Sequence, residues 1–354
     1  MNRSVRFASL LEERGFDAAL IHRRQNIRYL TGFTGEGYLF VARDFCAVMT
    51  DFRYTEQLSY QAPQCLCVRT HAGKSDAQLL EELCRRAKAD VLGVETDFIS
   101  YDEYVALVDA LPDVSIKPLA KLPEEMRAIK DADEFASMEK AAAIACRALE
   151  NLLPRIHPGM SEREVQIALD YEMLQLGSEE PAFDTIACAG PNGALPHAIP
   201  GERKLCPGDL LTLDFGATVN GYRSDMTRTL AIGKISSQLR EMYQAVLEAN
   251  RMALAAVRPG AVCGELDAIA RDFLEKDYPG MFGHSLGHGV GLDIHEFPWV
   301  RKGDQTVLQP GHVVTIEPGV YIPRLGGCRI EDMVLITEEG LINPSTSPKD
   351  LIEL

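Results

Sequence analysis

The sequence predicts a two-domain protein, with a small α/β domain followed by an α+β domain that is built from two similar halves. Three observations support this prediction. The chain of 354 residues is longer than a single hydrophobic core usually grows. Helical and β-rich patterns alternate through its first part. In the remainder, the order helix, Pro-Gly, helix, β-rich sequence occurs twice.

The first domain follows from alternating periodicities. Its helical patterns run from Val5 to Arg14, from Ser75 to Lys88 and from Tyr101 to Leu111. Between them lie β-rich runs such as AALI, YLFVA, CAVMT and CLCVRT, whose composition is typical of strands. The segment Ser115 to Met126 carries two prolines between weak apolar patterns, which favours a boundary there. We therefore expect domains at residues 1–122 and 123–354.

The second domain shows an internal repeat. A long helical pattern leads to Pro158-Gly159, after which Ser161 and Glu164 form the signature of a capping box at the start of another helix. The same order returns around Pro259-Gly260. We interpret this as two similar halves with a site between them, although Pro-Gly could also recur between helices by chance.

Composition narrows the class of protein. With 46% hydrophobic and 25% charged residues, and no apolar run long enough for a membrane span, the chain is typical of a globular protein in water. Its net charge of -16 disfavours nucleic acid and anionic membranes as partners. No secretion signal is apparent, and the nine scattered cysteines suit a reducing compartment. We expect a cytoplasmic protein.

A predicted hairpin brings two aspartates together. The stretch DLLTLDFGATVNGYRSDMTRTLAI contains β-rich runs around Asn220-Gly221, a dipeptide that suits a two-residue type I′ turn. Such a turn pairs residue 219 with 222 and 216 with 225, so Asp214 would lie diagonally across from Asp225 on one face. Because buried, unpaired carboxylates are costly, a cation between them is one interpretation. A solvated face with two unrelated acids is the other.

Histidines cluster in a second stretch, FGHSLGHGVGLDIHE. It holds His284, His288 and His295, three of the eight histidines in the chain. A single histidine is more often structural, but clustering in a glycine-rich run next to acids favours ligands or catalytic groups. The spacing matches neither HExxH nor a cysteine-based zinc site.

A third stretch, VVTIEPGVYIPRLGGCRIEDMVLIT, places acids in apolar surroundings. Glu317 ends one β-rich run, and Glu331 lies in another beyond a Pro/Gly loop. An acid in so apolar a run needs a compensating partner. That partner is either a metal ion or a base such as Arg329.

Four carboxylates and one imidazole would form a mostly hard donor set. Such a set suits Mn²⁺ better than the thiolate-rich sites of structural zinc, although Co²⁺, Zn²⁺ or Fe²⁺ could occupy it. Two divalent ions would balance four carboxylate charges. A pair of ions about 3.5–4 Å apart can lower the pKa of a bridging water and polarise a scissile carbonyl, as amide hydrolysis requires.

These stretches resemble a known enzyme family. Residues from about 130 to 345 are similar to the metallopeptidases prolidase, aminopeptidase P, methionine aminopeptidase and creatinase, whose shared catalytic domain has the pita-bread fold. The motifs LDFG, SDMTRT, GHGVGLDIHE, TIEPGVY and RIED stand in the order of that family. The resemblance implies that the metal ligands are Asp214, Asp225, His288, Glu317 and Glu331, with Asp225 and Glu331 bridging the two ions.

The resemblance also implies roles for neighbouring residues. His197 and His295 would bind substrate or stabilise the tetrahedral intermediate, and Glu317 would carry the proton from water to the leaving amine. Arg329 would orient a ligand carboxylate beside the substrate. His284 would shape the substrate pocket, and a purely structural role stays open for His197 and His284.

Within the family, two features narrow the expected activity. The N-terminal domain argues against an ordinary methionine aminopeptidase, and the complete ligand set argues against creatinase and relatives that only bind. We expect a homodimeric dinuclear exopeptidase that hydrolyses the Xaa-Pro bond of dipeptides or short peptides with proline second. The alternatives are a catalytically weak peptide-binding or partner-binding protein of this fold, and a metal-dependent hydrolase of a non-peptide amide.

Substrate length depends on one departure from the family pattern. Some prolidases have an arginine soon after the HE of HExP, which binds the free carboxylate of a dipeptide. Here the run is HEFPWVRK, with Trp299 nearest and Arg301 two residues later. Either Arg301 serves this purpose, or the site is open at that end and accepts longer peptides.

Overall fold

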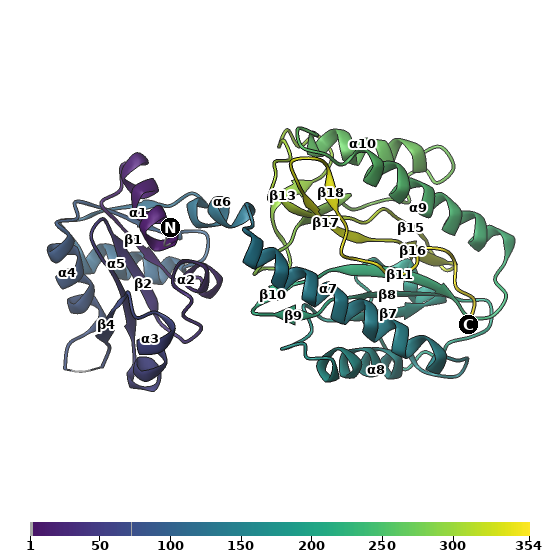
Figure 1. The fold of residues 1–354 in the computed structure, drawn as a ribbon, viewed down its shortest axis with the longest axis horizontal. Helices are drawn as coiled ribbons and strands as arrows, with labels where there is room; N and C mark the ends of the chain where they lie inside the picture. Colours follow the sequence, from purple (N-terminus) through teal and green to yellow (C-terminus); the bar gives the residue numbers. More distant parts are fainter. Residues whose placement is uncertain (1–2, 72) are drawn as a thin grey trace. The chain divides into compact units, whose positions relative to one another are not determined.

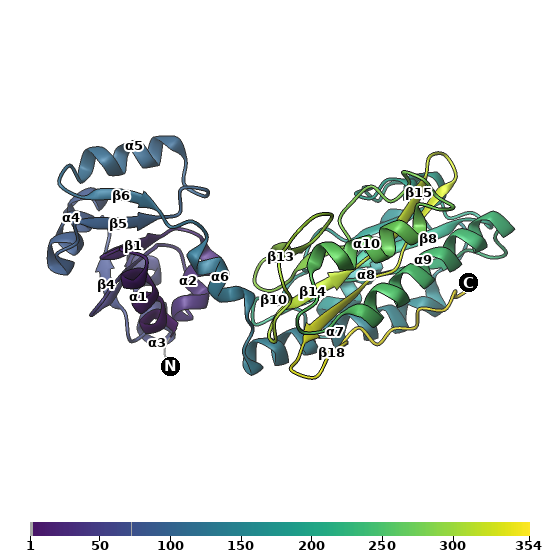
Figure 2. The ribbon, with the colours of Figure 1, turned by 90° about the horizontal axis from the view of Figure 1, so that it is seen from above.

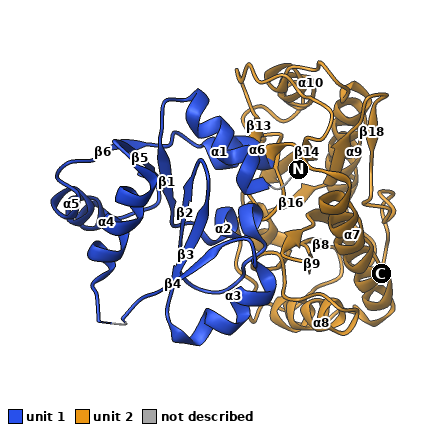
Figure 3. Ribbon diagram, turned by 60° about the vertical axis from the view of Figure 1, so that its left-hand side comes forward, with its two compact units in different colours: residues 1–127 blue, residues 128–354 orange. Residues whose placement is uncertain are grey.

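The computed structural model describes residues 3–71 and 73–354. They divide into two compact units, residues 1–127 and residues 128–354 (Figure 3). The boundary predicted from the sequence, after residue 122, falls at the start of helix α6 (Leu122–Ala128). No helix in the described ranges combines the length and the hydropathy needed to cross a bilayer.

Unit 1 contains a six-stranded mixed sheet with the order β4-β3-β2-β1-β5-β6. The strands are β1 (Ala18–Ile21), β2 (Tyr38–Ala42), β3 (Cys46–Thr50), β4 (Leu66–Arg69), β5 (Val91–Val94) and β6 (Ser115–Pro118). The helices are α1 (Arg3–Glu13), α2 (Arg24–Thr31), α3 (Thr55–Gln61), α4 (Asp76–Ala87) and α5 (Tyr101–Ala110). The helical and β-rich patterns of the sequence therefore lie where they were predicted.

The sheet of unit 1 is covered by helices on both faces, as Figures 1 and 2 show. This explains why β1 and β3 are buried along their whole length and read as continuous apolar runs rather than alternating ones. Capping boxes at Ser75 and Ser100 begin α4 and α5, and Leu80 and Leu83 of α4 enter the core. The α/β architecture predicted for this domain is confirmed.

Unit 2 is made of two halves, each with two long helices and an antiparallel sheet (Figure 1). The first half holds α7 (Ala132–Leu152), α8 (Glu162–Gln175), β7 (Ile186–Ala189), β8 (Leu210–Phe215) and β11 (Met226–Ala231). The second holds α9 (Ser237–Ala256), α10 (Cys263–Leu274), β12 (Gly287–Gly289), β13 (Glu296–Val300), β14 (Val313–Ile316), β17 (Asp332–Ile336) and β18 (Leu341–Ile342). The ribbons β9 (Thr218–Val219) with β10 (Tyr222–Arg223) and β15 (Gly319–Ile322) with β16 (Gly326–Arg329) complete the unit.

The repeat around Pro-Gly is a repeat in backbone geometry. Gly159 and Gly260 both have positive φ, +92° and +85°, which glycine adopts without steric cost. Gly159 N donates to Leu205 O and Gly260 N donates to Leu308 O, each at 2.9 Å. The two Pro-Gly pairs therefore occupy equivalent corners of the two halves, and the prediction of two similar halves is confirmed.

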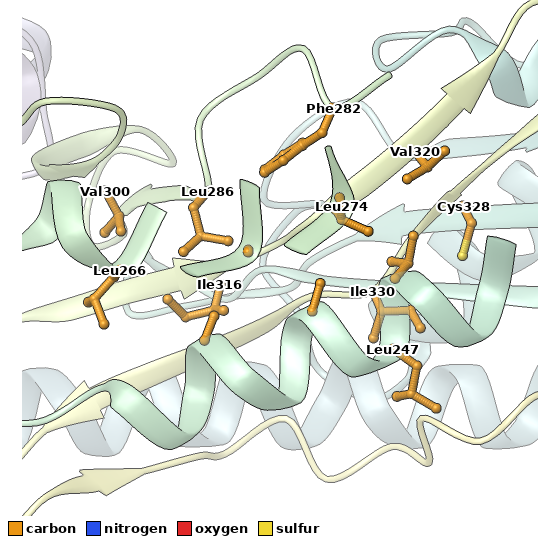
Figure 4. Close-up of a cluster of buried hydrophobic side chains, with 14 of the residues drawn as sticks. Leu247, Leu266, Leu274, Phe282, Leu286, Val300, Ile316, Val320, Cys328 and Ile330 are labelled. Carbon is orange, nitrogen blue, oxygen red and sulfur yellow. The ribbon is translucent and has the colours of Figure 1, made fainter. Parts of the chain in front are cut away.

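An apolar core fixes the strands that carry the polar residues described below. In the second half, side chains of α9 and α10 such as Leu247, Leu266 and Leu274 pack with Ile316 and with strand residues further along the chain (Figure 4). A fully buried side chain of this size contributes about 1.5–3 kcal/mol. Close packing of this kind leaves little freedom for the strand ends.

The hairpin predicted around Asn220-Gly221 has the predicted register. Both residues have positive φ, +49° and +71°, as a type I′ turn requires. Tyr222 pairs with Val219 in the ribbon of β9 and β10, and Thr227 of β11 pairs with Asp214 of β8 in the three-stranded sheet, in the same register. Asp225, two residues before Thr227, therefore lies diagonal to Asp214 on the same face.

Candidate metal centre

The acids and the histidine expected to bind metal stand at strand ends in both halves of unit 2. Asp214 lies in β8, and Asp225 directly precedes β11. In the second half, His288 lies in β12, Glu317 directly follows β14, and Glu331 directly precedes β17. Rigid strands from the two halves thus present these side chains to one region.

Three of the five side chains form a compact cluster. Asp225, His288 and Glu331 each offer a ligand atom, and these atoms lie within 4.8 Å of one another. All three residues are buried. His288 Nε2 is 3.6 Å from Asp225 Oδ2 and 3.3 Å from Glu317 Oε1, so Glu317 borders the cluster.

Asp214 stands beside the cluster and is held by an arginine. Arg329 Nη2 donates to Asp214 Oδ2 at 2.6 Å. The other oxygen, Asp214 Oδ1, is buried and accepts no hydrogen bond in the described part of the chain. A buried carboxylate oxygen without a donor is costly, and a cation is the partner that would satisfy it.

The electrostatics of the cluster also fit a bound cation. Burial, followed by the neighbouring carboxylates, raises the pKa of Asp225 and that of Glu331 well above the usual range. Burial lowers the pKa of His288, but Glu317 and Asp225 outweigh it and raise that pKa to about 9. A group of acids this crowded needs positive charge to be ionised together, and divalent ions on hard oxygen and imidazole donors would supply it.

Two threonines contact candidate metal ligands and a tyrosine contacts Arg329, and none of the three was predicted from the sequence. Thr227 Oγ1 donates to Glu331 Oε2 at 2.6 Å, and Thr315 Oγ1 donates to Glu317 Oε1 at 3.2 Å. Tyr321 OH accepts from Arg329 Nη1 at 2.6 Å. The available signal was strand alternation, because Thr227 lies two residues after Asp225 and Thr315 two residues before Glu317.

A cavity of about 830 Å³ opens onto the cluster. Its lining includes every residue predicted for the site except Arg301, and it also includes Arg163, Asp184 and Trp299. Arg301 instead pairs with Asp304 at 3.4 Å and is 57% exposed. The sequence therefore pointed to an arginine that the structure does not bring into the cavity.

The three other predicted histidines lie around the cavity in different settings. His197 and His295 are exposed, and the His295 ring lies 4.3 Å from the ring of His288, centroid to centroid. His284 Nε2 shares a hydrogen bond with Tyr321 OH at 2.9 Å, and burial lowers the pKa of His284. His284 Nδ1 lies 2.8 Å from Ser285 O, so both ring nitrogens have partners within the protein.

Helix α10 anchors the loop that carries His284. Asp267, which is fully buried, accepts from Leu286 N and pairs with Arg271 at 2.7 Å. Arg271 in turn donates to Phe282 O and to His284 O. The backbone on both sides of His284 is therefore tied to one helix.

Comparison with known proteins identifies the family to which this chain belongs. Residues 136–338 match the model of metallopeptidase family M24, and residues 3–129 match that of the creatinase/prolidase N-terminal domain. The chain belongs to metallopeptidase family M24. As a member of M24 it is a metal-dependent peptidase, and its buried Asp/His/Glu cluster is the candidate divalent metal site.

Relatives of known structure extend the match over both units. The structure of an Xaa-Pro dipeptidase from Bacillus anthracis is 40% identical, with a TM-score of 0.96 over 99% of each chain. An X-Pro aminopeptidase from Thermotoga maritima is 32% identical, with a TM-score of 0.89 over 97% of this chain and 99% of that one. An Xaa-Pro dipeptidase from Pyrococcus furiosus is 37% identical over 99% of both chains. The pita-bread fold expected of this M24 member is confirmed.

Proposed function

We propose that this M24 peptidase is a dinuclear exopeptidase that hydrolyses the Xaa-Pro bond at the N-terminus of dipeptides or short peptides. The observation that carries the proposal is the buried convergence of Asp225, His288 and Glu331 beside a cavity large enough for a short peptide. Relatives named Xaa-Pro dipeptidase and X-Pro aminopeptidase support the substrate class.

In this proposal the metal ions are held by Asp214, Asp225, His288, Glu317 and Glu331, with Mn²⁺ as the first candidate. The hard donor set supports Mn²⁺, and Co²⁺, Zn²⁺ and Fe²⁺ are the alternatives to be tested. When bound, a divalent pair lowers the pKa of a water and polarises the scissile carbonyl.

The protein's own groups would position the substrate and move the proton. Glu317, held by Thr315 and next to His288, would transfer the proton from the attacking water to the leaving amine nitrogen. His295 and His197 would donate hydrogen bonds to the oxygen of the scissile carbonyl as its negative charge develops. Arg329 would keep Asp214 in place.

Metal loading and mutation test the proposal. The parental protein, stripped and reloaded with Mn²⁺, Co²⁺ or Zn²⁺, should cleave Xaa-Pro peptides, and Asp225→Asn and Glu331→Gln should each lower kcat/KM by roughly a thousandfold or more. Asp184→Asn is the matched control, because Asp184 is an exposed acid that lines the same cavity. A folded Asp225→Asn protein that works at the parental rate would refute the proposed metal site.

Arg163 is our candidate for binding the free carboxylate of the substrate. Two guanidinium groups line the cavity in the described ranges, and Arg329 is engaged by Asp214. Arg163 lies in the first turn of α8, is exposed, and donates to Gln166 Oε1 at 3.2 Å. It is thus available for a charge-assisted hydrogen bond with a peptide carboxylate.

Substrates with and without that carboxylate test this role. Arg163→Ala should raise KM for a free Xaa-Pro dipeptide by roughly tenfold or more, since hydrogen bonds to charged groups contribute about 1.5–3 kcal/mol. It should leave KM for the corresponding C-terminal amide almost unchanged, as should the control Arg301→Ala for both substrates. An equal rise for acid and amide would rule out carboxylate recognition by Arg163.

Two further expectations belong to this proposal. We infer a homodimer, which sedimentation or light scattering of the purified chain would test; a monomer at assay concentration would contradict it. We also infer a cytoplasmic location, which fractionation of the source cells would test.

A further inference from the structure

Two cysteines of unit 1 face each other across neighbouring strands. Cys46 begins β3, and Cys65 directly precedes β4, the edge strand of the six-stranded sheet. The strands run parallel with Ala47 opposite Leu66, so the same register places Cys46 opposite Cys65. Their sulfur atoms are 2.6 Å apart, and both thiols are free.

This pairing is particular to these two positions. The structure describes all nine cysteines, and no other two thiols in residues 3–71 and 73–354 share a hydrogen bond. Cys67, two residues beyond Cys65, is exposed and lies apart from the pair. Proximity of the two sulfurs is the main requirement for a disulfide, because cysteines that are far apart cannot be joined without backbone movement.

A small cavity gives a reagent access to the pair. Its volume is about 140 Å³, and its lining includes Ser4, Cys46 and Gln64. One water molecule occupies about 30 Å³ in the liquid, so the cavity accommodates an oxidant of the size of hydrogen peroxide. Cys65 is itself partly exposed, which leaves a second route for reducing thiols.

The local hydrogen bonds divide the chemical roles between the two thiols. The contact with Cys65 and the Ser4 hydroxyl lower the pKa of Cys46, against the opposing effect of burial. The contact with Cys46, followed by burial, raises the pKa of Cys65. The thiolate is the reactive form of cysteine, so Cys46 is the sulfur expected to react first.

We propose that Cys46 and Cys65 form a peroxide-responsive disulfide site in unit 1. The Cys46 thiolate attacks one oxygen of hydrogen peroxide, so that an S–O bond forms, the O–O bond breaks, and the leaving hydroxide takes a proton to become water. Cys65 then loses its proton and attacks the Cys46 sulfur; the S–S bond forms, the S–O bond breaks, and a second water leaves. The two sulfurs are each oxidised by one electron and the peroxide is reduced by two.

The site is reversible, and both of its cysteines belong to unit 1. A low-molecular-weight thiol restores both cysteines by two exchange steps through a mixed disulfide. The disulfide closes a segment that includes β3 and α3. Oxidation therefore joins β3 covalently to the residue before the edge strand β4 and restricts the movement of that edge of the sheet.

Peptide mapping of the full-length protein tests the proposal. The protein is treated with hydrogen peroxide, denatured in N-ethylmaleimide and digested with trypsin without reduction. Cleavage at Arg43, Arg53 and Arg69 separates Cys46 from Cys65. We expect a cross-linked species of residues 44–53 and 54–69 with Cys67 alkylated, which disappears after dithiothreitol. Alkylation of both Cys46 and Cys65 to the same extent as exposed Cys206 would overturn the proposal.

Variants separate the pair from its surroundings and test the order of reaction. Cys67→Ser is the matched control and should form the cross-link at the parental rate. Cys65→Ser should form no cross-link and should accumulate a sulfenic acid at Cys46 that dimedone labels. Loss of the cross-link in Cys67→Ser, or dimedone labelling at Cys65 but not Cys46 in the parental protein, would contradict the assignment. The measurement on the parental protein does not depend on how well any variant folds.

Discussion

A single hydroxyl, that of Thr227, connects the candidate ligands to the rest of unit 2. Thr227 Oγ1 donates to Glu331 and accepts from Arg329 Nε at 3.2 Å, while Arg329 holds Asp214. Groups that orient a metal ligand usually change metal affinity or activity by about 10- to 100-fold when they are removed. Removal of the Thr227 hydroxyl should therefore alter the orientation of both Glu331 and Asp214.

Replacement of this hydroxyl provides the first prediction. Thr227→Val keeps the shape of the side chain and should weaken Mn²⁺ binding by about 10- to 100-fold, measured by metal titration. Thr212→Val is the control, because Thr212 is buried in the neighbouring strand β8 and contacts Thr229 and Gly327 rather than a ligand. Equal metal affinities in the two variants would show that the hydroxyl has no orienting effect.

His312 gives a second prediction at the scale of one residue. It is buried, and its Nδ1 accepts from Gln309 N at 3.1 Å. Burial, followed by the charge of Lys130, lowers the pKa of His312 from 6.5 to about 4. Between these two values the unfolded chain binds more protons than the folded chain, so acid favours unfolding. The contribution of neutral His312 to the free energy of unfolding is complete above pH 6.5 and is lost as the pH falls to about 4.

The size of this effect follows from the difference between the two pKa values, and amounts to about 3 kcal/mol. His312→Asn, whose side-chain oxygen can replace Nδ1 as acceptor, should make the free energy of unfolding less dependent on pH between 6.5 and 4. Urea titrations at several pH values measure this slope. His157 is exposed, so His157→Asn should keep the parental dependence of the free energy of unfolding on pH. An unchanged dependence in His312→Asn would show that His312 does not cause it.

At the scale of elements, helix α10 and the loop before β12 act together. The pair of Asp267 and Arg271 holds the backbone at Phe282, His284 and Leu286. The cavity wall near His284 is therefore built by a helix that contributes no residue to the cavity lining. A substitution that removes Asp267 or Arg271 from α10 should therefore displace the cavity wall near His284, because these hydrogen bonds would be lost.

The third prediction compares two ion pairs with the same helical spacing. Asp267→Asn leaves Arg271 without its carboxylate in a largely buried position and should lower the free energy of unfolding by about 3 kcal/mol. Glu81→Gln removes the exposed partner of Arg85 in α4 and should cost about 0.3–0.5 kcal/mol. Chemical denaturation measures both values. Similar decreases in the free energy of unfolding in the two variants would mean that burial of an ion pair has little effect on its contribution to stability.

For the whole molecule, the division into two units has a consequence for metal binding. The candidate ligands all belong to residues 128–354, so the metal should stabilise unit 2 alone. A ligand present at a hundred times its dissociation constant stabilises the state that binds it by about 2.7 kcal/mol.

The fourth prediction follows from this linkage. Mn²⁺ at that concentration should slow hydrogen exchange of β8, β12 and β14 and leave the core strands β1 and β2 unchanged. In the variant Asp225→Asn, Mn²⁺ should no longer slow hydrogen exchange in unit 2. Equal protection of both units by Mn²⁺ would contradict a metal site confined to residues 128–354.

Local features of the sequence predicted most of the elements. The Asn220-Gly221 dipeptide determined both the turn and its register, because only a few residues tolerate positive φ at two successive positions. The capping box at Ser161 and the Pro-Gly corners likewise depend on neighbouring residues alone. Turn and capping patterns give no partner for the Thr227 hydroxyl, because that partner, Glu331, lies 104 residues away in the chain.

By itself, the sequence determined the order of elements, the repeat in the second domain and the chemical type of the candidate ligands, since these follow from periodicity, turn chemistry and motif residues. Only the tertiary structure decided that Asp225, His288 and Glu331 meet in space, that Arg329 binds Asp214, and that Arg163 rather than Arg301 lines the cavity. The physical reason is that such contacts depend on strand register and helix packing between distant segments, which local preferences do not specify.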